Sequence, residues 1–321
     1  MRGTIWPLFT LLLGFSLLQM SNGLQGTLLA VRAGLEGFGG ATTGLIMSGF
    51  FAGLRLGSFA APRLIDGVGH IRTFAGLASL ASAAALMHLA FINPWVWITV
   101  RICTGFAFAG LIIVTESWLN ASVSSAQRGK LLAVYGMVGM AAGAAGQFML
   151  NLGDPAEFIL FVLVSIVMSL ALVPISLTRI EGPRAEETQE PPSLKRLWGL
   201  SPYGAVAAAL VGASIGTFYG LAPLFAQQIG YAQSQIALFI AAFTIGGLIL
   251  QFPLGWLSDR VSRRGLGIVL ALAGAVLMLV TFPLSAPSRM LLLVLGFAIG
   301  GLILPAQALV IAPVNGRAPG S

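Results

Sequence analysis

Long apolar segments separated by short polar ones run through the whole of this sequence. A helix of about 20 apolar residues is long enough to cross the roughly 30 Å hydrocarbon core of a bilayer. The pattern therefore predicts an all-α membrane protein with about ten transmembrane helices. The predicted spans are residues 5–30, 42–62, 73–92, 95–118, 130–152, 157–178, 203–227, 232–256, 266–285 and 289–311.

Composition agrees with this prediction. The chain is 57% hydrophobic and 8% charged, whereas a soluble domain carries roughly 25% charged residues. Many of its 41 glycines lie three or four residues from another small residue. This spacing lets helices approach closely in lipid, so a soluble fold is excluded.

The basic residues indicate an orientation. With a cytoplasmic N-terminus, thirteen lysines and arginines fall in inside segments and two, Arg32 and Arg289, fall in outside loops. Cytoplasmic loops of membrane proteins are enriched in these residues. The net charge of +7 is therefore explained by basic residues that orient the chain in the membrane. No nucleic-acid partner is expected.

One segment, residues 179–202, differs from the other connections. It is rich in glutamate, proline and basic residues, a composition that cannot bury a core. We predict a cytoplasmic linker here, between an N-terminal six-helix bundle at residues 1–178 and a C-terminal bundle of four helices at residues 203–321.

The two bundles contain a repeated segment. GFAFAGLI at residues 105–112 and GFAIGGLI at residues 296–303 are identical at six of eight positions and lie 191 residues apart. This offset places the counterparts of the fifth and sixth spans beyond residue 321. The second bundle is therefore expected to be incomplete, either because the chain is a truncated fragment or because it is a natural ten-span form.

Residues 255–264, GWLSDRVSRR, resemble the G-x-x-x-D-R-x-G-R-R loop of the major facilitator superfamily, with Ser262 in place of a glycine. The first-half counterpart, residues 62–72, keeps the aspartate, Asp66. Six spans, a charged linker and a second set in the same order also resemble this family. The resemblance implies two pseudo-symmetric bundles, with twelve helices in a complete chain. Asn93, residues 35–37 (LEG) and residues 116–120 (ESWLN) resemble a YcaD-like bacterial branch.

The resemblance implies that the aspartate loops open and close the cytoplasmic gate; the alternative is that their charges are merely solvated. Arg101, followed by Gly105 and Ala109, resembles a fourth-helix motif linked to proton coupling or substrate translocation. Alternatively, Arg101 snorkels outward. Glu116 is expected to be a structural gate residue paired with an arginine such as Arg55, Arg63 or Arg128. The predicted gate and coupling residues are Asp66, Arg101, Glu116, Arg128, Asp259, Arg260 and Arg263.

Polar side chains inside apolar spans are candidates for the substrate cavity. Arg55 either lines the cavity, where it would attract an anionic group, or snorkels inward. Intramembrane amides also simply bridge helices. His88 is expected at the outer membrane interface. The cavity candidates are Asn22, Gln25, Arg55, Gln147, Tyr219 and Gln251.

The sequence contains no Walker phosphate loop, no HExxH and no Cys/His cluster, and its one cysteine is Cys103. We therefore expect no enzyme activity, no metal and no cofactor. The predicted function is proton-coupled secondary transport of a small solute by alternating access. We expect a monomer in the bacterial inner membrane whose partners are a small-molecule substrate, lipid and protons. The alternatives are a non-functional truncated fragment and a membrane-embedded lipid-modifying enzyme.

Overall fold

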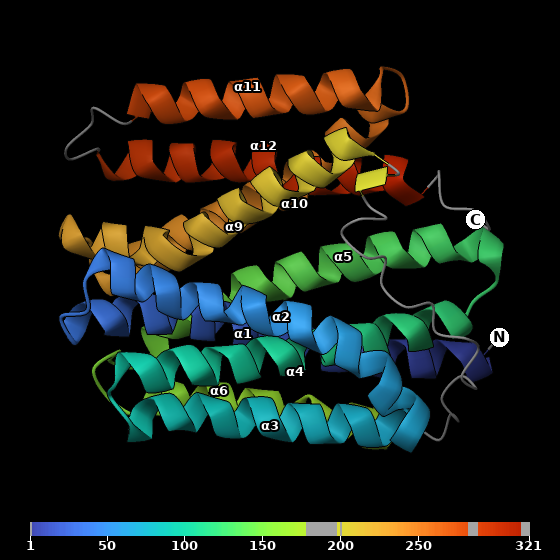
Figure 1. Ribbon diagram of the computed structural model, residues 1–321, viewed down its shortest axis with the longest axis horizontal. Helices are drawn as coiled ribbons and strands as arrows, with labels where there is room; N and C mark the ends of the chain where they lie inside the picture. The colour runs from blue at the N-terminus through green and yellow to red at the C-terminus, as the bar shows by residue number, and fades with distance from the viewer. Residues whose placement is uncertain (1, 178–197, 200, 282–287, 316–321) are drawn as a thin grey trace. The chain divides into compact units, whose positions relative to one another are not determined.

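The computed structural model describes residues 2–177, 198–199, 201–281 and 288–315, and their regular structure is helical (Figure 1). The chain divides into two compact units, residues 1–191 (unit 1) and 192–321 (unit 2). Most of the predicted linker, residues 179–202, lies outside the described residues.

Among its described residues, 2–177, unit 1 contains seven α-helices and one short 3₁₀ helix. They are α1 (Arg2–Leu35), α2 (Gly40–Val68), α3 (His70–Ala90), α4 (Pro94–Ala121), α5 (Ser125–Phe148), η1 (Met149–Leu152), α6 (Ile159–Leu170) and α7 (Leu172–Ser176). Unit 2 contains, within its described residues, α9 (Pro202–Gln228), α10 (Gln233–Ser258), α11 (Arg263–Thr281) and α12 (Arg289–Asn315). Each of the ten predicted spans overlaps one of these helices; the fifth also includes η1, the sixth covers α6 and α7 together, and residues 282–285 of the ninth lie outside the described residues. Eight segments of the described chain are long and apolar enough to cross a membrane, so the all-α membrane fold is confirmed.

Local sequence explains where α4 and α9 begin. The Asn93 side chain accepts hydrogen bonds from the backbone N–H groups of Trp95 and Val96, and Pro94 is the first helical residue. Ser201 caps α9 in the same way, by accepting from the Gly204 N–H ahead of Pro202. A polar N-cap satisfies donors that the first turn leaves free, and proline fits that turn because it needs no N–H donor.

Glycines hold α2 and α4 together. A Cβ on Gly53 would collide with the backbone of Ile102, and one on Gly105 would collide with the carbonyl of Phe50. In unit 2, α10 packs along α12 in the same way, with Gly246 against the Phe297 backbone. Small residues allow the backbone contact that drives helix association in lipid.

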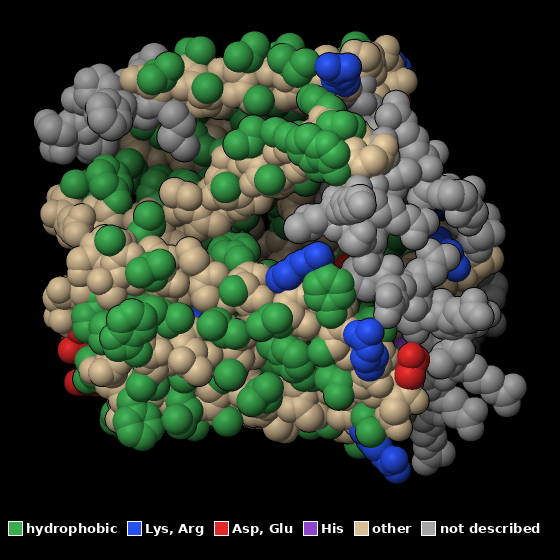
Figure 2. Space-filling model, viewed as in Figure 1, with side chains coloured by type: hydrophobic (Ala, Val, Ile, Leu, Met, Phe, Trp, Pro, Cys, Tyr) green, Lys and Arg blue, Asp and Glu red, His purple; other side chains and the backbone are tan. Residues whose placement is uncertain are grey.

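The surface of both units is largely apolar. Figure 2 shows hydrophobic side chains spread over the helices on the face in view. Leu56, Leu210, Phe252 and Leu279 are among the large apolar side chains that are more than half exposed. An apolar exterior of this kind is favourable in lipid and unfavourable in water.

Candidate functional site

A buried arginine lies inside unit 1. Arg101 is on α4, about 10 Å from its beginning at 1.5 Å per residue, and only 3% of its surface is exposed. Its guanidinium carbon lies 4.4 Å from the centre of the Phe50 ring on α2. Its Nε and Nη1 atoms have no hydrogen-bond partner. The side chain is therefore held inside the bundle rather than extended to the membrane surface.

Two features of α2 make room for this side chain. Gly49 leaves α2 without a Cβ where α4 passes, and a Cβ built there would lie 3.4 Å from the Cβ of Arg101. Phe50 presents its ring face to the guanidinium, a cation–π contact that strengthens when the cation is removed from water. These contacts stabilise the charge in part but leave its donors unused.

His88 of α3 is a second buried group beside this arginine. It is fully buried, it interacts electrostatically with Arg101, and its Nε2 atom has no hydrogen-bond partner. Its Nδ1 atom lies 2.9 Å from the Ala84 carbonyl oxygen, and its ring stands at 71° to that of Trp97. His88 was expected near the outer end of the third span; it lies in the last turn of α3, buried against Trp97 of α4 rather than exposed.

Three candidate amides lie on α1 and α5. The Gln147 carbonyl oxygen accepts a hydrogen bond from the Thr27 hydroxyl, which joins α5 to α1. Gln25 is fully buried, and neither amide atom has a hydrogen-bond partner. Asn22 is half-buried on α1. Gln147 therefore has the bridging contact that the sequence analysis gave as the alternative to substrate binding.

Glu116 has a different partner from the arginine that the sequence analysis expected. Its carboxylate accepts a hydrogen bond from the hydroxyl of Tyr135 on α5. The Tyr135 ring stacks on Phe15 of α1, with centroids 4.0 Å apart. Arg55 lies instead over the ring of Phe59 on its own helix, and Arg128 is exposed. Tyr135 was missed because hydropathy does not show which way a tyrosine of α5 faces.

The loop residues occupy the ends of their helices. Asp66 is exposed in the last turn of α2, where it interacts electrostatically with His70, and His70 Nε2 lies 2.9 Å from the Ser117 hydroxyl of α4. In unit 2, Asp259 follows the last residue of α10 and is exposed. Arg260 lies 3.6 Å over the Trp256 ring. Arg263 begins α11, and its side chain lies outside the described residues.

The two remaining candidates lie in unit 2. The Tyr219 hydroxyl is 2.8 Å from the Thr244 hydroxyl, which links α9 to α10. Gln251 is half-buried on α10. Arg101 and His88 therefore form the candidate centre of unit 1. A buried cation lies there beside a buried imidazole, and both side chains have nitrogen atoms without a hydrogen-bond partner. Among the described residues no group of three or more His, Cys, Asp or Glu could hold a metal ion.

The family model described as "Major Facilitator Superfamily" matches residues 11–320. The chain belongs to the major facilitator superfamily. It is a multi-pass membrane protein of a family of transporters, as the sequence motifs indicated, and not an enzyme.

Two relatives are described as uncharacterized MFS-type transporters. An uncharacterized MFS-type transporter of Enterobacter sp. (strain 638) is 31% identical over 262 residues, which cover 80% of this chain and 68% of that protein. The uncharacterized MFS-type transporter YcaD of Escherichia fergusonii is 28% identical over 91% of this chain and 78% of its own length. The resemblance to the YcaD-like branch is thereby confirmed.

Solved structures share the fold. The nucleoside transporter NupG superposes with a TM-score of 0.71 at 13% identity, covering 99% of this chain and 88% of that one. A D-xylose–proton symporter gives a TM-score of 0.70 at 15% identity, covering 95% and 86%. At these identities the likeness concerns the fold alone.

Proposed function

We propose that this MFS transporter moves a small solute by alternating access and couples that movement to protons. The observation that carries the proposal is the burial of Arg101 with two guanidinium nitrogens unpartnered beside His88. An ionisable side chain within a membrane span is costly and usually serves a pathway or a coupling step. The xylose transporter whose fold is similar is, by its name, a proton symporter.

The unused donors suggest how coupling would work. Arg101 can form charge-assisted hydrogen bonds with an anionic or carbonyl oxygen. If such an oxygen reaches Arg101 in only one state of the cycle, the cost of burying the cation changes between states. An equilibrium responds to a ligand only through such a difference in free energy between its two states. Arg101 would then link solute or proton binding to the conformational change.

The other residues take supporting roles in this proposal. The loops carrying Asp66 and Asp259 would latch the cytoplasmic gate, helped by Arg128, Arg260 and Arg263. Glu116 would brace α4 against α5 through Tyr135. Asn22, Gln25, Arg55, Gln147, Tyr219 and Gln251 remain proposed cavity residues. We further propose that the protein acts as a monomer in a bacterial inner membrane, with its N-terminus in the cytoplasm.

Solute uptake into proteoliposomes tests this role of Arg101. Purified protein is screened with sugars, nucleosides, amino acids and organic anions, with and without an imposed pH gradient. We expect one solute class to accumulate only with the gradient, Arg101→Leu to abolish that accumulation, and Arg101→Lys to retain part of it. Cys103→Ser serves as the matched control. Gradient-driven accumulation by Arg101→Leu at the wild-type level would contradict the proposal.

A further inference from the structure

Arg55 lies in the middle of α2, a helix that is long and apolar enough to cross a membrane. It comes 15 residues after the helix begins at Gly40 and 13 before it ends at Val68, which corresponds to about 22 Å and 20 Å at 1.5 Å per residue. Arginines near the ends of a span extend to the membrane surface, but Arg55 is too far from either end of α2 to do so. Its charge therefore stays at the depth of the hydrocarbon core.

The Arg55 side chain is exposed, and its charge is not balanced by a neighbour. Its guanidinium carbon lies 4.1 Å over the centre of the Phe59 ring, one turn further along α2. It forms no ion pair with any residue that the structure describes. An unpaired charge at this depth is unfavourable against lipid, and such residues face the interior of a bundle or a water-filled cavity. The face of α2 that carries Arg55 therefore borders water.

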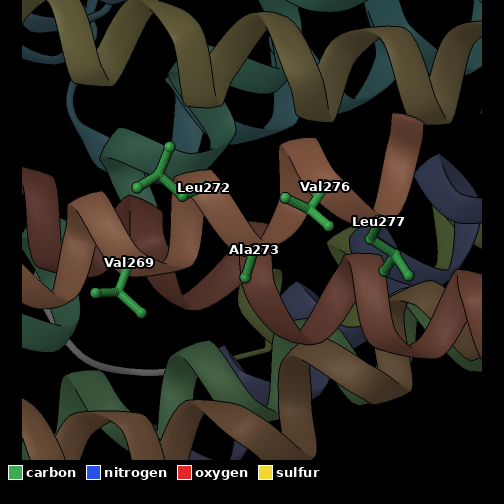
Figure 3. Close-up of a pocket in the computed structure, with 5 residues that line it drawn as sticks. All are labelled: Val269, Leu272, Ala273, Val276 and Leu277. Atoms are coloured by element: carbon green, nitrogen blue, oxygen red, sulfur yellow. The ribbon is translucent and has the colours of Figure 1, made fainter. Parts of the chain in front are cut away.

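Helix α11 has an exposed face of the opposite kind at the same depth. Figure 3 shows the side chains that line a depression on its surface, and all of them are apolar: Val269, Leu272, Ala273, Val276 and Leu277. Leu272 is nine residues from each end of α11 and 62% exposed. Exposed apolar side chains of this kind are favourable in lipid. The exposed face of α2 differs from this one because it carries a cation.

The internal repeat indicates that the fold does not need an arginine at this position. Gly53 of α2 packs on the α4 backbone, and Gly246 of α10 packs on the α12 backbone, 193 residues later. The aspartates of the two gate loops have the same separation. At this offset Arg55 corresponds to Leu248. Since a leucine occupies the equivalent place in a helix that packs in the same way, the arginine is explained by a function and not by packing.

The neighbours of Arg55 define the kind of anion that fits. Phe51 and Phe59 come four residues before and after it, so they lie on the same face of α2; Phe51 is 42% exposed and Phe59 is half-buried. A guanidinium over a ring face keeps N–H donors at its edge, where they match the two oxygens of a carboxylate. One cation balances one negative charge, and a second charge would lie unpaired among the phenyl rings at a high cost. The site therefore fits an anion with a single charge and an apolar body.

We propose that Arg55 binds the carboxylate of the transported solute, and that this solute is an organic monocarboxylate with an apolar body. Resting on the transport function proposed above, the assignment names the class of its solute. The rings of Phe51 and Phe59 would contact the apolar body. Neither proton coupling nor Arg101 is required for this binding.

Ligand-dependent thermal unfolding of the purified full chain in detergent tests this binding. The probes are benzoate and hexanoate, each compared with its amide, which has nearly the same shape and no charge. We expect the carboxylates, at millimolar concentration, to raise the melting temperature of the wild type by a few degrees, and the amides to have no effect. Arg55→Leu should lose this shift, and Arg55→Lys should keep part of it. The matched control is Arg289→Leu, which removes an exposed arginine at the start of α12 and should keep the full shift.

Equal stabilisation of the wild type by carboxylates and amides would overturn the proposal. So would equal stabilisation of the wild type and Arg55→Leu by benzoate. A shift with inorganic phosphate and none with either carboxylate would assign the site to another anion and would also overturn it, as would the absence of any shift in the wild type.

Access of water to position 55 is a second, independent measurement. In a Cys103→Ser background, Arg55→Cys in membrane vesicles should react with a charged methanethiosulfonate reagent, because the reactive species is the ionised thiol, which forms in water and not in lipid. Leu272→Cys, at the midpoint of α11, should stay unmodified. An unreactive Arg55→Cys, or equal rates at the two positions, would overturn the proposal.

Both measurements are made without a pH gradient and without solute uptake. A failure of proton coupling would therefore leave their results unchanged. Gradient-driven accumulation of a neutral sugar or nucleoside, by a protein that binds neither carboxylate, would overturn the assignment of Arg55 and leave the proposed coupling intact.

Discussion

At the scale of single residues, the structure separates polar groups that bridge helices from groups that have no partner. Ser82 contacts Ser165 and Ser169 across the α3–α6 interface, and Gln147 is bonded to Thr27. Arg101 and Gln25 are buried without such contacts. Bridging groups should contribute to stability, whereas unpartnered groups cost stability and are retained for another reason.

Replacing Ser82 should therefore destabilise the fold by a small amount. Ser82→Ala removes the hydroxyl contacts to α6, and intramembrane hydrogen bonds contribute roughly 0.6 to 2 kcal/mol. The measurement is thermal unfolding in detergent. The control is Ser48→Ala, because the Ser48 hydroxyl is exposed and bonds only within its own helix, to the Gly44 carbonyl. Equal melting temperatures for the two variants would contradict this assignment.

Arg101 should behave in the opposite way. Arg101→Met removes a buried cation with unused donors and keeps an apolar chain of similar length. We expect its thermal stability to match or exceed that of the wild type, because replacing buried charge by apolar groups is often neutral or stabilising. Transport should be lost at the same time. A large loss of stability in this variant would indicate that Arg101 is a structural residue.

At the scale of elements, hydropathy was sufficient to locate the helices but not to orient them. Each of the ten predicted spans overlaps a helix of the described chain, and eight segments of that chain are long and apolar enough to cross a bilayer. The adjacency of Arg101 and His88, and that of Glu116 and Tyr135, depends on the rotation of one helix against another. Hydropathy carries no such information when a helix is apolar on every side. The partners of these charges therefore could not be predicted.

The α2–α4 interface should be the packing contact of unit 1 most sensitive to side-chain size. Gly105→Leu places a side chain against the Phe50 backbone, and overpacking of this kind costs about 1 to 3 kcal/mol. Gly76→Leu on α3 is the control, since a Cβ there would meet nothing within 4 Å. Thermal unfolding of the two variants should show a lower melting temperature for Gly105→Leu. The interpretation fails if Gly76→Leu is destabilised as strongly.

At the scale of the whole molecule, the internal repeat indicates the family and the distribution of basic residues predicts the orientation in the membrane. The repeated segment and the two aspartate loops indicated the superfamily from the sequence, and the family match over residues 11–320 confirms it. The bias of basic residues toward one side predicts a cytoplasmic N-terminus. Substrate identity does not follow from these features, because the polar residues of the spans are few and several of them bond to other helices.

The predicted topology can be measured by thiol labelling of intact cells. In a Cys103→Ser background, a cysteine replacing the exposed Glu157 between η1 and α6 should react with a membrane-impermeant maleimide. A cysteine replacing the exposed Val261, between α10 and α11, should react only after the membrane is opened. The reverse pattern would place the N-terminus outside.

The most direct test of proton-coupled transport is the internal pH of proteoliposomes that contain a pH-sensitive dye. A solute identified by uptake is added to wild-type vesicles without an imposed gradient. The proposal predicts an immediate pH change inside wild-type vesicles and none in Arg101→Leu vesicles, with both proteins equally folded. Solute uptake by the wild type without any change in internal pH would contradict proton coupling.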